Sequence, residues 1–378
     1  MLSRVDYSPF GAYSVAILSP RVDTTPYLSP RRRLTHQSKR INMTISFLDF
    51  IPQGVQLLIE WLLQAVTSNY GWAVVLFTVI IKVALSPLDI WQRMAMASNN
   101  RKMKRIKPQL DQISKKYAND QQMMYAKQNE LYKKENIKLM GGCLPMILTL
   151  IIFFSVFSGF NQMTRNQAIE AYNEVYITYT QAYNEAMVGN TDVVIGYRAG
   201  EDAVLAKDDE DPFFKSWLHI GNIFVSDTPW SSKLPTYDTY TGTGMGSLGI
   251  KDTDFAEGVV FSADEYNKVM KALEEKYAGQ VNGYLILPLL AVALSWLSQW
   301  LSRKGQPQVE GAAGSGKGMQ IVMVGMMGVF ALFYSSAFAI YMVVSQIYSI
   351  ILQAIFNVVN KYLDDKEQDR IMSTTFKR

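Results

Sequence analysis

The chain has 378 residues, of which 49% are hydrophobic and 19% charged, with a formal net charge of +4. Long apolar stretches alternate with strongly charged ones, which excludes a single soluble core and favours a polytopic, all-helical membrane protein. The only cysteine, Cys143, excludes an intrachain disulfide. Only His36 and His219 are present, on predicted opposite sides of the first span, so histidine triads and His-based metal sites are unsupported. We expect no cofactor, no metal and no enzymatic activity.

The N-terminal region divides at Met43. Residues 1–42 contain seven Lys/Arg and only two acids, which opposes transfer of this stretch across a membrane. We therefore hypothesise that Met43 is the native start and that 1–42 is an upstream extension. Residues 43–70 contain no Lys or Arg, and "FLDFIPQGVQLLIEWLLQAV" (47–66) predicts an amphipathic helix lying in the outer interface.

Five apolar segments approach the roughly 20 helical residues that cross a bilayer. They are residues 71–91, 143–163, 284–301, 319–337 and 339–359. The last two are separated only near Ser335 and Ser336, which predicts a tight helical hairpin.

Charge predicts the orientation of these spans. Residues 92–142 contain twelve Lys/Arg and four Asp/Glu, a net of +8, and are expected in the cytoplasm. Residues 164–282 contain nine Lys/Arg and nineteen Asp/Glu, a net of −10, and are expected outside. The loop 302–318 is again basic. The N-terminus is then outside, and the tail 360–378 is cytoplasmic.

Lys82 stands inside the first span, within "LFTVIIKVALSPLD" (76–89). A lysine at the centre of a span costs roughly 2.5–3.5 kcal/mol on insertion scales. Thr78, Lys82 and Ser86 share an arc of about 80° with Asp89 and Arg93. The third and fifth spans have similar polar stripes: Ser295, Ser298, Gln299 and Ser302 on one, and Ser345, Gln346, Ser349, Gln353, Asn357 and Asn360 on the other.

Two explanations of these stripes remain open. Serine and glutamine between membrane helices can act only as interhelical hydrogen-bond partners, worth about 0.6 kcal/mol each. Alternatively, the three stripes line one wet cavity. The cavity suits Lys82 better, because no other span has an interior acid to neutralise it. Asp89 is about 10 Å away along the helix and is expected to pair with Arg93.

Residues 93–139 predict two helices broken near "YANDQQ". Met103, Ile106, Leu110, Ile113 and Tyr117 form a coiled-coil seam, with a weaker seam through Met124 and Leu131 in the second helix. The other faces are basic. They either only set topology or dock RNA-rich or acidic cytoplasmic partners. The candidate docking residues are Arg101, Lys102, Lys104, Arg105, Lys107, Lys115 and Lys116.

The outer segment 164–282 begins with a helical continuation of the second span. Ser262 and Glu265 predict the start of a second amphipathic helix, through a capping box. Between these two predicted helices lies an aromatic and aliphatic cluster, which is expected on the membrane surface or the helix tops: Phe213, Phe214, Trp217, Ile220, Ile223, Phe224 and Trp230.

Three chemical motifs fail on their context. "GMGSLG" (244–249) has no strand-to-helix setting and is a glycine-rich loop. "GAAGSGKG" (311–318) lacks the Ser/Thr that a P-loop needs after Lys317 and is a linker. Lys82 and Ser86 have dyad spacing but no identifiable oxyanion hole, which argues against a protease.

Taken together, these stretches resemble the YidC/Oxa/Alb family of membrane protein insertases, in its single-membrane bacterial form. The resemblance runs through "NYGWAVVLFTVIIKVALSPLDIWQRMAM", the basic hairpin, "GGCLPMILTLIIFFSVF", "NGYLILPLLAVALSWLSQWLS" and "FALFYSSAFAIYMVVSQIYSIILQ". It implies a five-helix core around a hydrophilic groove that is closed on the outer side, with a cytoplasmic coiled-coil hairpin and an extracytoplasmic insertion.

The resemblance also implies that the chain inserts and helps to fold nascent membrane proteins in the plasma membrane. The implied partners are the ribosome, the Sec translocon and the lipid bilayer, and not DNA. The groove residues would be Lys82, Thr78, Ser86, Thr149, Ser295, Gln299 and Gln346.

The chain departs from the family pattern at several points. Lys82 replaces the usual arginine, Thr149 stands where a glutamine is expected, and 164–282 is long for single-membrane members. The alternative function is a small-solute transporter or channel using the same cavity, or a scaffold that acts through its hairpin alone. Neither the inverted repeats nor the paired midplane site of a transporter is found.

Overall fold

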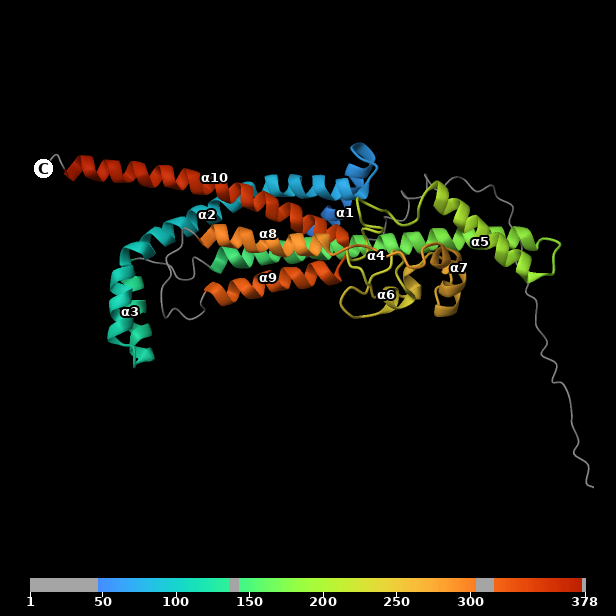
Figure 1. Cartoon of the computed structure of the whole chain (residues 1–378), viewed down its shortest axis with the longest axis horizontal. Helices are drawn as coiled ribbons and strands as arrows, with labels where there is room; N and C mark the ends of the chain where they lie inside the picture. The colour runs from blue at the N-terminus through green and yellow to red at the C-terminus, as the bar shows by residue number, and fades with distance from the viewer. Residues whose placement is uncertain (1–46, 136–142, 304–315, 376–378) are drawn as a thin grey trace, which may run out of the picture. The chain divides into compact units, whose positions relative to one another are not determined.

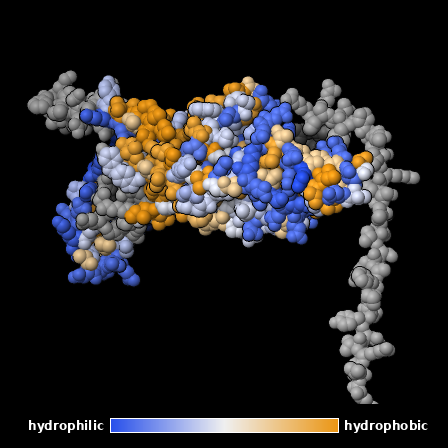
Figure 2. Space-filling model, turned by 45° about the vertical axis from the view of Figure 1, so that its right-hand side comes forward, coloured by the Kyte–Doolittle hydropathy of each residue, from blue (hydrophilic) through white to orange (hydrophobic). Residues whose placement is uncertain are grey.

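The computed structural model describes residues 47–135, 143–303 and 316–375. Within these ranges the chain is helical and has no named strand, as the composition predicts. Two helices are long and apolar enough to cross a bilayer, Tyr70–Lys116 and Ser336–Tyr362. Two shorter apolar helices, Ile286–Ser302 and Ile321–Phe333, accompany them. In Figure 2, hydrophobic side chains gather over the stretch of the long helices, with hydrophilic surface on either side.

Helix α1 (Phe47–Ala65) and helix α2 (Tyr70–Lys116) come first. The apolar face of α1 buries Val55, Ile59 and Leu62 in the main core, as its amphipathic pattern predicts. Asn69 caps α2 by accepting a hydrogen bond from the Gly71 amide at 3.0 Å. Helix α2 continues through Pro87 and Pro108 without a break.

Helices α2 and α3 (Gln121–Lys134) form the predicted hairpin of two helices, visible as the teal pair in Figure 1. Ile106 and Leu110 of α2 are buried against Leu131 and Tyr132 of α3, with Met103 and Ile113 packed beside them. The seam therefore lies where its spacing indicates. Gln128, which the pattern did not single out, is also buried and donates to the Ser114 hydroxyl at 3.2 Å.

Helix α4 (Cys143–Met187) has 45 residues, about 68 Å of helix, which is more than twice the thickness of a bilayer core. The sequence predicts this continuation beyond the second apolar segment. Helix α5 (Val193–Glu210) then packs back along it, as Figure 1 shows in yellow-green. The sequence pattern does not predict α5, because the apolar residues of this helix do not form one clear stripe.

Two short helices complete the outer segment, α6 (Tyr237–Thr241) and α7 (Ala263–Lys276). Their core is rich in tyrosine and includes Tyr172, Tyr179, Tyr240 and Tyr266. Ser262 caps α7 as predicted, accepting from the Glu265 amide at 3.3 Å. Glu265 itself pairs with Lys268 at 2.7 Å rather than completing a capping box.

The predicted aromatic and aliphatic cluster is divided between three environments. Phe213 and Phe214 belong to the tyrosine-rich core of the outer segment. Ile220 and Ile223 belong to the main core of the long helices. Trp230 is exposed. The segment therefore ties its own core to that of the long helices, which single-residue hydrophobicity could not predict.

The last three helices are α8 (Ile286–Arg303), α9 (Gly316–Phe333) and α10 (Ser336–Thr375). Figure 1 shows all three running alongside α2 and α4. The break between α9 and α10 falls at the expected serines. The first amides of α10 donate to the outer segment: Ser336 to the Val225 carbonyl at 2.9 Å and Ala337 to the Ile223 carbonyl at 2.8 Å. These contacts satisfy amides that a helix N-terminus leaves unpaired.

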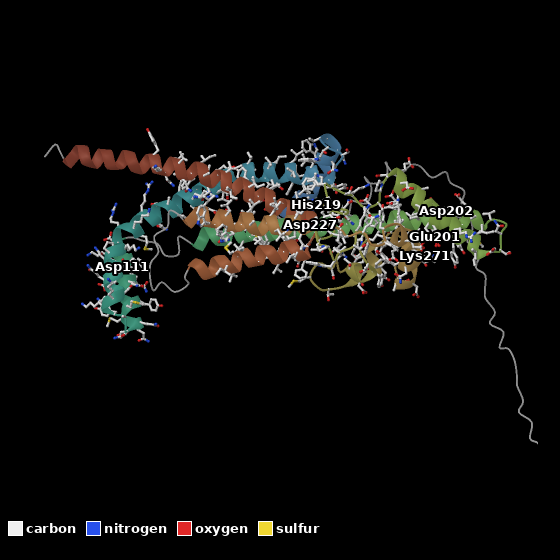
Figure 3. All side chains as sticks on the ribbon, viewed as in Figure 1. Asp111, Glu201, Asp202, His219, Asp227 and Lys271 are labelled. Carbon is white, nitrogen blue, oxygen red and sulfur yellow. The ribbon has the colours of Figure 1, made fainter. Side chains whose placement is uncertain are left out.

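Asp227 performs the same task for α8. Its buried carboxylate accepts hydrogen bonds from the Tyr284 amide at 2.8 Å and the Leu287 amide at 2.7 Å. His219 lies beside it, 3.3 Å away (Figure 3). A negative charge at a helix N-terminus is stabilised by the helix dipole. The loop from Ile220 to Thr228 thus fastens the starts of both α8 and α10.

Candidate functional site

Aromatic rings fill one end of the contact between α2, α4 and α10. Phe77 and Phe160 meet edge to face with centroids 5.8 Å apart, and Phe160 lies at the same distance from Phe338. Tyr341 packs on Phe338 at 5.8 Å. All four side chains are buried. This part of the helix contact is closed by apolar packing.

Immediately after Phe77, the α2 face becomes polar. Thr78 is fully buried and donates to the Val74 carbonyl at 2.7 Å, so its hydroxyl is satisfied within the helix. One turn further on lies Lys82, and after another turn Ser86. The Ser86 hydroxyl is bonded to the Lys82 carbonyl at 3.0 Å and shares a hydrogen bond with the Tyr348 hydroxyl of α10. The predicted stripe therefore faces α10.

Lys82 is partly buried. In the described ranges, no hydrogen bond or ion pair connects its ammonium group to another side chain. Ile80 and Val83, about 160° and 100° around the helix from Lys82, are exposed. The lysine thus stands on the packed side of α2, just after the aromatic rings.

Arg93 marks the far end of the stripe. Its guanidinium donates to Gln353 Oε1, and to the Ser349 carbonyl at 3.4 Å, both on α10. The expected Asp89–Arg93 ion pair is absent from the described part of the chain, because Arg93 turns across to α10 instead. A guanidinium presents several donors in one plane and can reach both acceptors at once.

Gln353 joins the three predicted stripes. Besides Arg93 on α2, it contacts the Ser302 hydroxyl of α8 at 3.4 Å and donates to Asn357 on its own helix at 2.7 Å. The polar faces of α2, α8 and α10 therefore meet at this residue.

The other proposed groove residues differ in their burial and in their contacts. Ser295 of α8 is buried, and its hydroxyl has no hydrogen-bond partner. Gln299 and Gln346 are partly buried. Thr149 of α4 is exposed and donates to Gln92 of α2 at 3.4 Å. Gln92 is not one of the residues of the polar stripe.

Sequence reasoning missed Tyr348. It lies about 60° outside the predicted polar arc of α10. A tyrosine reaches across that angle because its hydroxyl stands at the end of a long ring. The aromatic residue next to a serine-rich stripe was the available signal.

The hairpin presents its basic residues away from its seam. Arg101, Lys104, Arg105, Lys115 and Lys116 are exposed, and Lys102 and Lys107 are partly buried. They all lie on α2 and form a cationic surface beyond the polar stripe.

Comparison with known proteins agrees with this arrangement. Residues 61–193 match the family described as 60Kd inner membrane protein. The Leptospira interrogans (serovar Lai, strain 56601) protein named membrane protein insertase YidC is 37% identical over 107 residues, covering 27% of this chain and 16% of the relative. The proteins of the same name from Helicobacter pylori (strain 26695) and Pseudomonas aeruginosa (strain LESB58) are 33% and 35% identical over 135 and 142 residues.

The Helicobacter match covers 35% of this chain and 24% of the relative, and the Pseudomonas match 36% and 23%. The chain thus spans about a quarter or less of the length of these curated relatives. The region 61–193 contains α2, the hairpin and the whole of α4, whereas the sequence resemblance also draws on the segments that form α8, α9 and α10.

Proposed function

Since residues 61–193 make this chain a member of the YidC/Oxa/Alb family of membrane proteins, we propose that it acts as a membrane protein insertase. In this proposal the chain accepts apolar segments of nascent membrane proteins and releases them into lipid, and it also helps them fold.

One observation carries the proposal: Lys82 lies at the boundary between a closed aromatic contact and a polar helix face, without a partner in the described chain. A cation kept in a membrane segment without an ion-paired acid suits a surface that meets an anionic or hydrated group. The polar flank of a substrate, which must cross the bilayer, supplies such a group.

The mechanism follows from the order of these features along α2. A substrate enters beside the polar faces of α2, α8 and α10, where Ser86, Gln299 and Gln346 offer hydrogen bonds. Lys82 provides a temporary counter-charge for an acidic flank. The apolar segment then moves into lipid, driven by about 25 cal/mol per Å² of apolar surface removed from water. No nucleotide is needed.

The remaining features belong to the same proposal. Five helices cross the membrane, with the N-terminus outside and the C-terminus in the cytoplasm. The basic face of α2 near Arg101 and Lys104 docks a ribosome, whose RNA phosphates attract lysine and arginine. The Sec translocon is a second partner.

Reconstitution of the full chain in liposomes tests the proposal. Insertion of a single-span substrate with an acidic outer flank is measured by protease protection. Lys82→Arg keeps insertion, Lys82→Met lowers it severalfold because the counter-charge is lost, and Lys82→Glu abolishes it by repulsion. Full activity of Lys82→Glu would refute the counter-charge role.

A further inference from the structure

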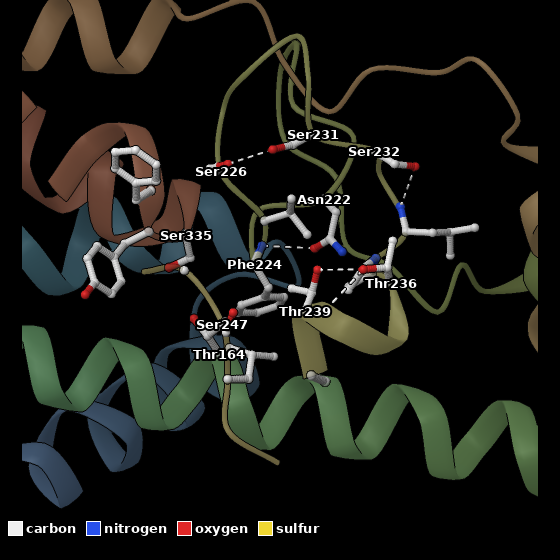
Figure 4. A pocket seen from close by; sticks show the side chains of 18 of the residues that line it. Thr164, Asn222, Phe224, Ser226, Ser231, Ser232, Thr236, Thr239, Ser247 and Ser335 are labelled. Carbon is white, nitrogen blue, oxygen red and sulfur yellow. Dashed lines mark hydrogen bonds between the residues drawn. The ribbon is translucent and has the colours of Figure 1, made fainter. Parts of the chain in front are cut away.

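A cavity of about 360 Å³ lies where the outer segment meets the ends of the long helices (Figure 4). Its walls come from α4 between Asn161 and Ala171, from the outer segment, and from the α9–α10 turn. It is large enough for several waters or one small ligand. It is separate from the polar stripe of α2, and nothing in the proposed insertase activity uses it.

The residues that line the cavity are uncharged and rich in hydroxyl groups. None of its 26 lining residues is charged, and eight are serine or threonine. Hydroxyl groups donate and accept, and they rotate to suit a partner. Phosphate, carboxylate or ammonium ligands would be buried there without a counter-ion, which is costly. A neutral ligand with many hydroxyl groups matches this surface.

Thr164 shows that the site is built rather than incidental. Its side chain is buried, 4% exposed, and its hydroxyl has no hydrogen-bond partner among the residues that the structure describes. Two other helical threonines, Thr78 and Thr178, donate this hydroxyl to the carbonyl four residues earlier, at 2.7 and 2.8 Å. Thr164 is one of the residues that line the cavity, and an unsatisfied buried hydroxyl there is costly unless a ligand or a small rearrangement satisfies it.

The glycine-rich loop "GMGSLG" supplies one wall and explains its own composition. Gly246 has φ +81°, and a Cβ there would stand 2.2 Å from the Phe333 carbonyl oxygen at the end of α9. Only glycine allows the loop to approach the helix so closely. The motif that failed as a nucleotide site thus forms part of a different pocket.

The rim of the cavity is apolar. Trp230, Met245 and Phe333 line it and are exposed by 66%, 65% and 47%. Phe333 ends an apolar helix, so the rim lies at the end of a proposed span. A polar cavity with an apolar rim suits an amphiphile whose headgroup is polar and whose chains lie in the membrane.

We propose that this cavity binds a neutral polyhydroxylated group, the sugar headgroup of a glycolipid in the outer leaflet. The sugar hydroxyls bond to Thr164 and the surrounding serines and threonines, and its acyl chains contact the rim.

The test uses the full chain in detergent, titrated with a neutral diglucosyl diacylglycerol and, separately, with free maltose. Binding is followed by tryptophan fluorescence and by co-elution of the glycolipid in gel filtration. We expect saturable glycolipid binding that Thr164→Val weakens about tenfold, the value of one lost hydrogen bond, while Thr164→Ser retains it. Thr178→Val, on the same helix but with an exposed and satisfied hydroxyl, is the matched control and leaves binding unchanged.

Maltose binding with the same Thr164 dependence would support the hydroxyl chemistry and assign the site to a free saccharide. Absence of saturable binding to both ligands would overturn the proposal and leave the cavity to water. Equal binding by Thr164→Val, or Thr164-dependent binding of plain phosphatidylcholine or of an uncharged peptide, would also overturn it.

Discussion

The hydroxyl groups of Ser86 and Tyr348 share a hydrogen bond between two helices whose residues are 262 positions apart in the chain. The bond lies one turn beyond Lys82 and holds α10 against the polar face of α2. The side chains that flank the lysine are therefore fixed, while its ammonium group has no partner within the described ranges.

Removing this hydroxyl pair should weaken the contact between α2 and α10. Ser86→Ala and Tyr348→Phe are each expected to cost about 1 kcal/mol, and the double variant less than their sum, since the first loss already breaks the bond. Melting of the full chain in detergent measures all three. Strict additivity would show that the bond contributes nothing. Ser158→Ala, exposed on α4, is the control and should leave the melting temperature unchanged.

Replacing Gln353 should lower stability more than Ser86→Ala or Tyr348→Phe, because Gln353 connects α2, α8 and α10. Gln353→Leu keeps the size of the side chain but leaves Arg93 and Ser302 without this acceptor. We expect a loss of about 2 kcal/mol, in the range for a hydrogen bond to a charged group, measured as a lower melting temperature. Gln353→Glu, which keeps an acceptor for Arg93, should be milder. A melting temperature of Gln353→Leu equal to that of the unmodified chain would contradict this.

The loop that fastens the outer ends of the helices provides a third test. Asp227→Ala leaves the Tyr284 and Leu287 amides without their acceptor and should cost about 3 kcal/mol. Gly283→Ala should resemble it, because a Cβ there would stand 1.9 Å from Asp227 Oδ1. Asp264→Ala, exposed in the first turn of α7, is the matched control. Equal melting temperatures for Asp227→Ala and Asp264→Ala would rule out a capping role.

The tyrosine-rich outer core should lose stability in alkali. Burial raises the pKa of Tyr179 and of Tyr277 from 10.0 to about 12. A pKa that is higher in the folded state gives stability that is fully present below the unfolded value and is lost as pH rises through the folded value. Near-UV circular dichroism of the full chain should therefore be constant up to about pH 10 and decline towards about pH 12. If all tyrosines ionised by about pH 10.5 while the near-UV circular dichroism spectrum stayed unchanged, burial of these tyrosines would not contribute to stability in this way.

The local patterns were sufficient for much of the fold. The hairpin seam through Ile106 and Leu110, the cap at Ser262 and the break before Ser336 follow from spacing and capping chemistry, which are local. The polar stripe on α2 was predictable for the same reason. Its partner helix was inferred only from the presence of other stripes.

What the sequence did not reveal depends on contacts between distant residues. Arg93 turns to Gln353 rather than Asp89 because α10 lies against α2, and one helix considered alone cannot show this. Asp227 appeared to be one of many acids in an acidic segment, although it caps α8. The cavity near Thr164 was equally hidden, because three separate parts of the chain form its walls.

Photocrosslinking of a stalled nascent membrane protein tests the central claim most directly. A photoreactive residue is placed at positions 78, 82, 299 or 346, which line the proposed groove, and at positions 80 or 83, which are exposed and lie outside the polar stripe of α2. The account predicts crosslinks to the apolar segment of the substrate from the first group and few from the second. Equal crosslinking from both groups, or crosslinking from 80 and 83 alone, would contradict substrate passage along the polar face that contains Lys82.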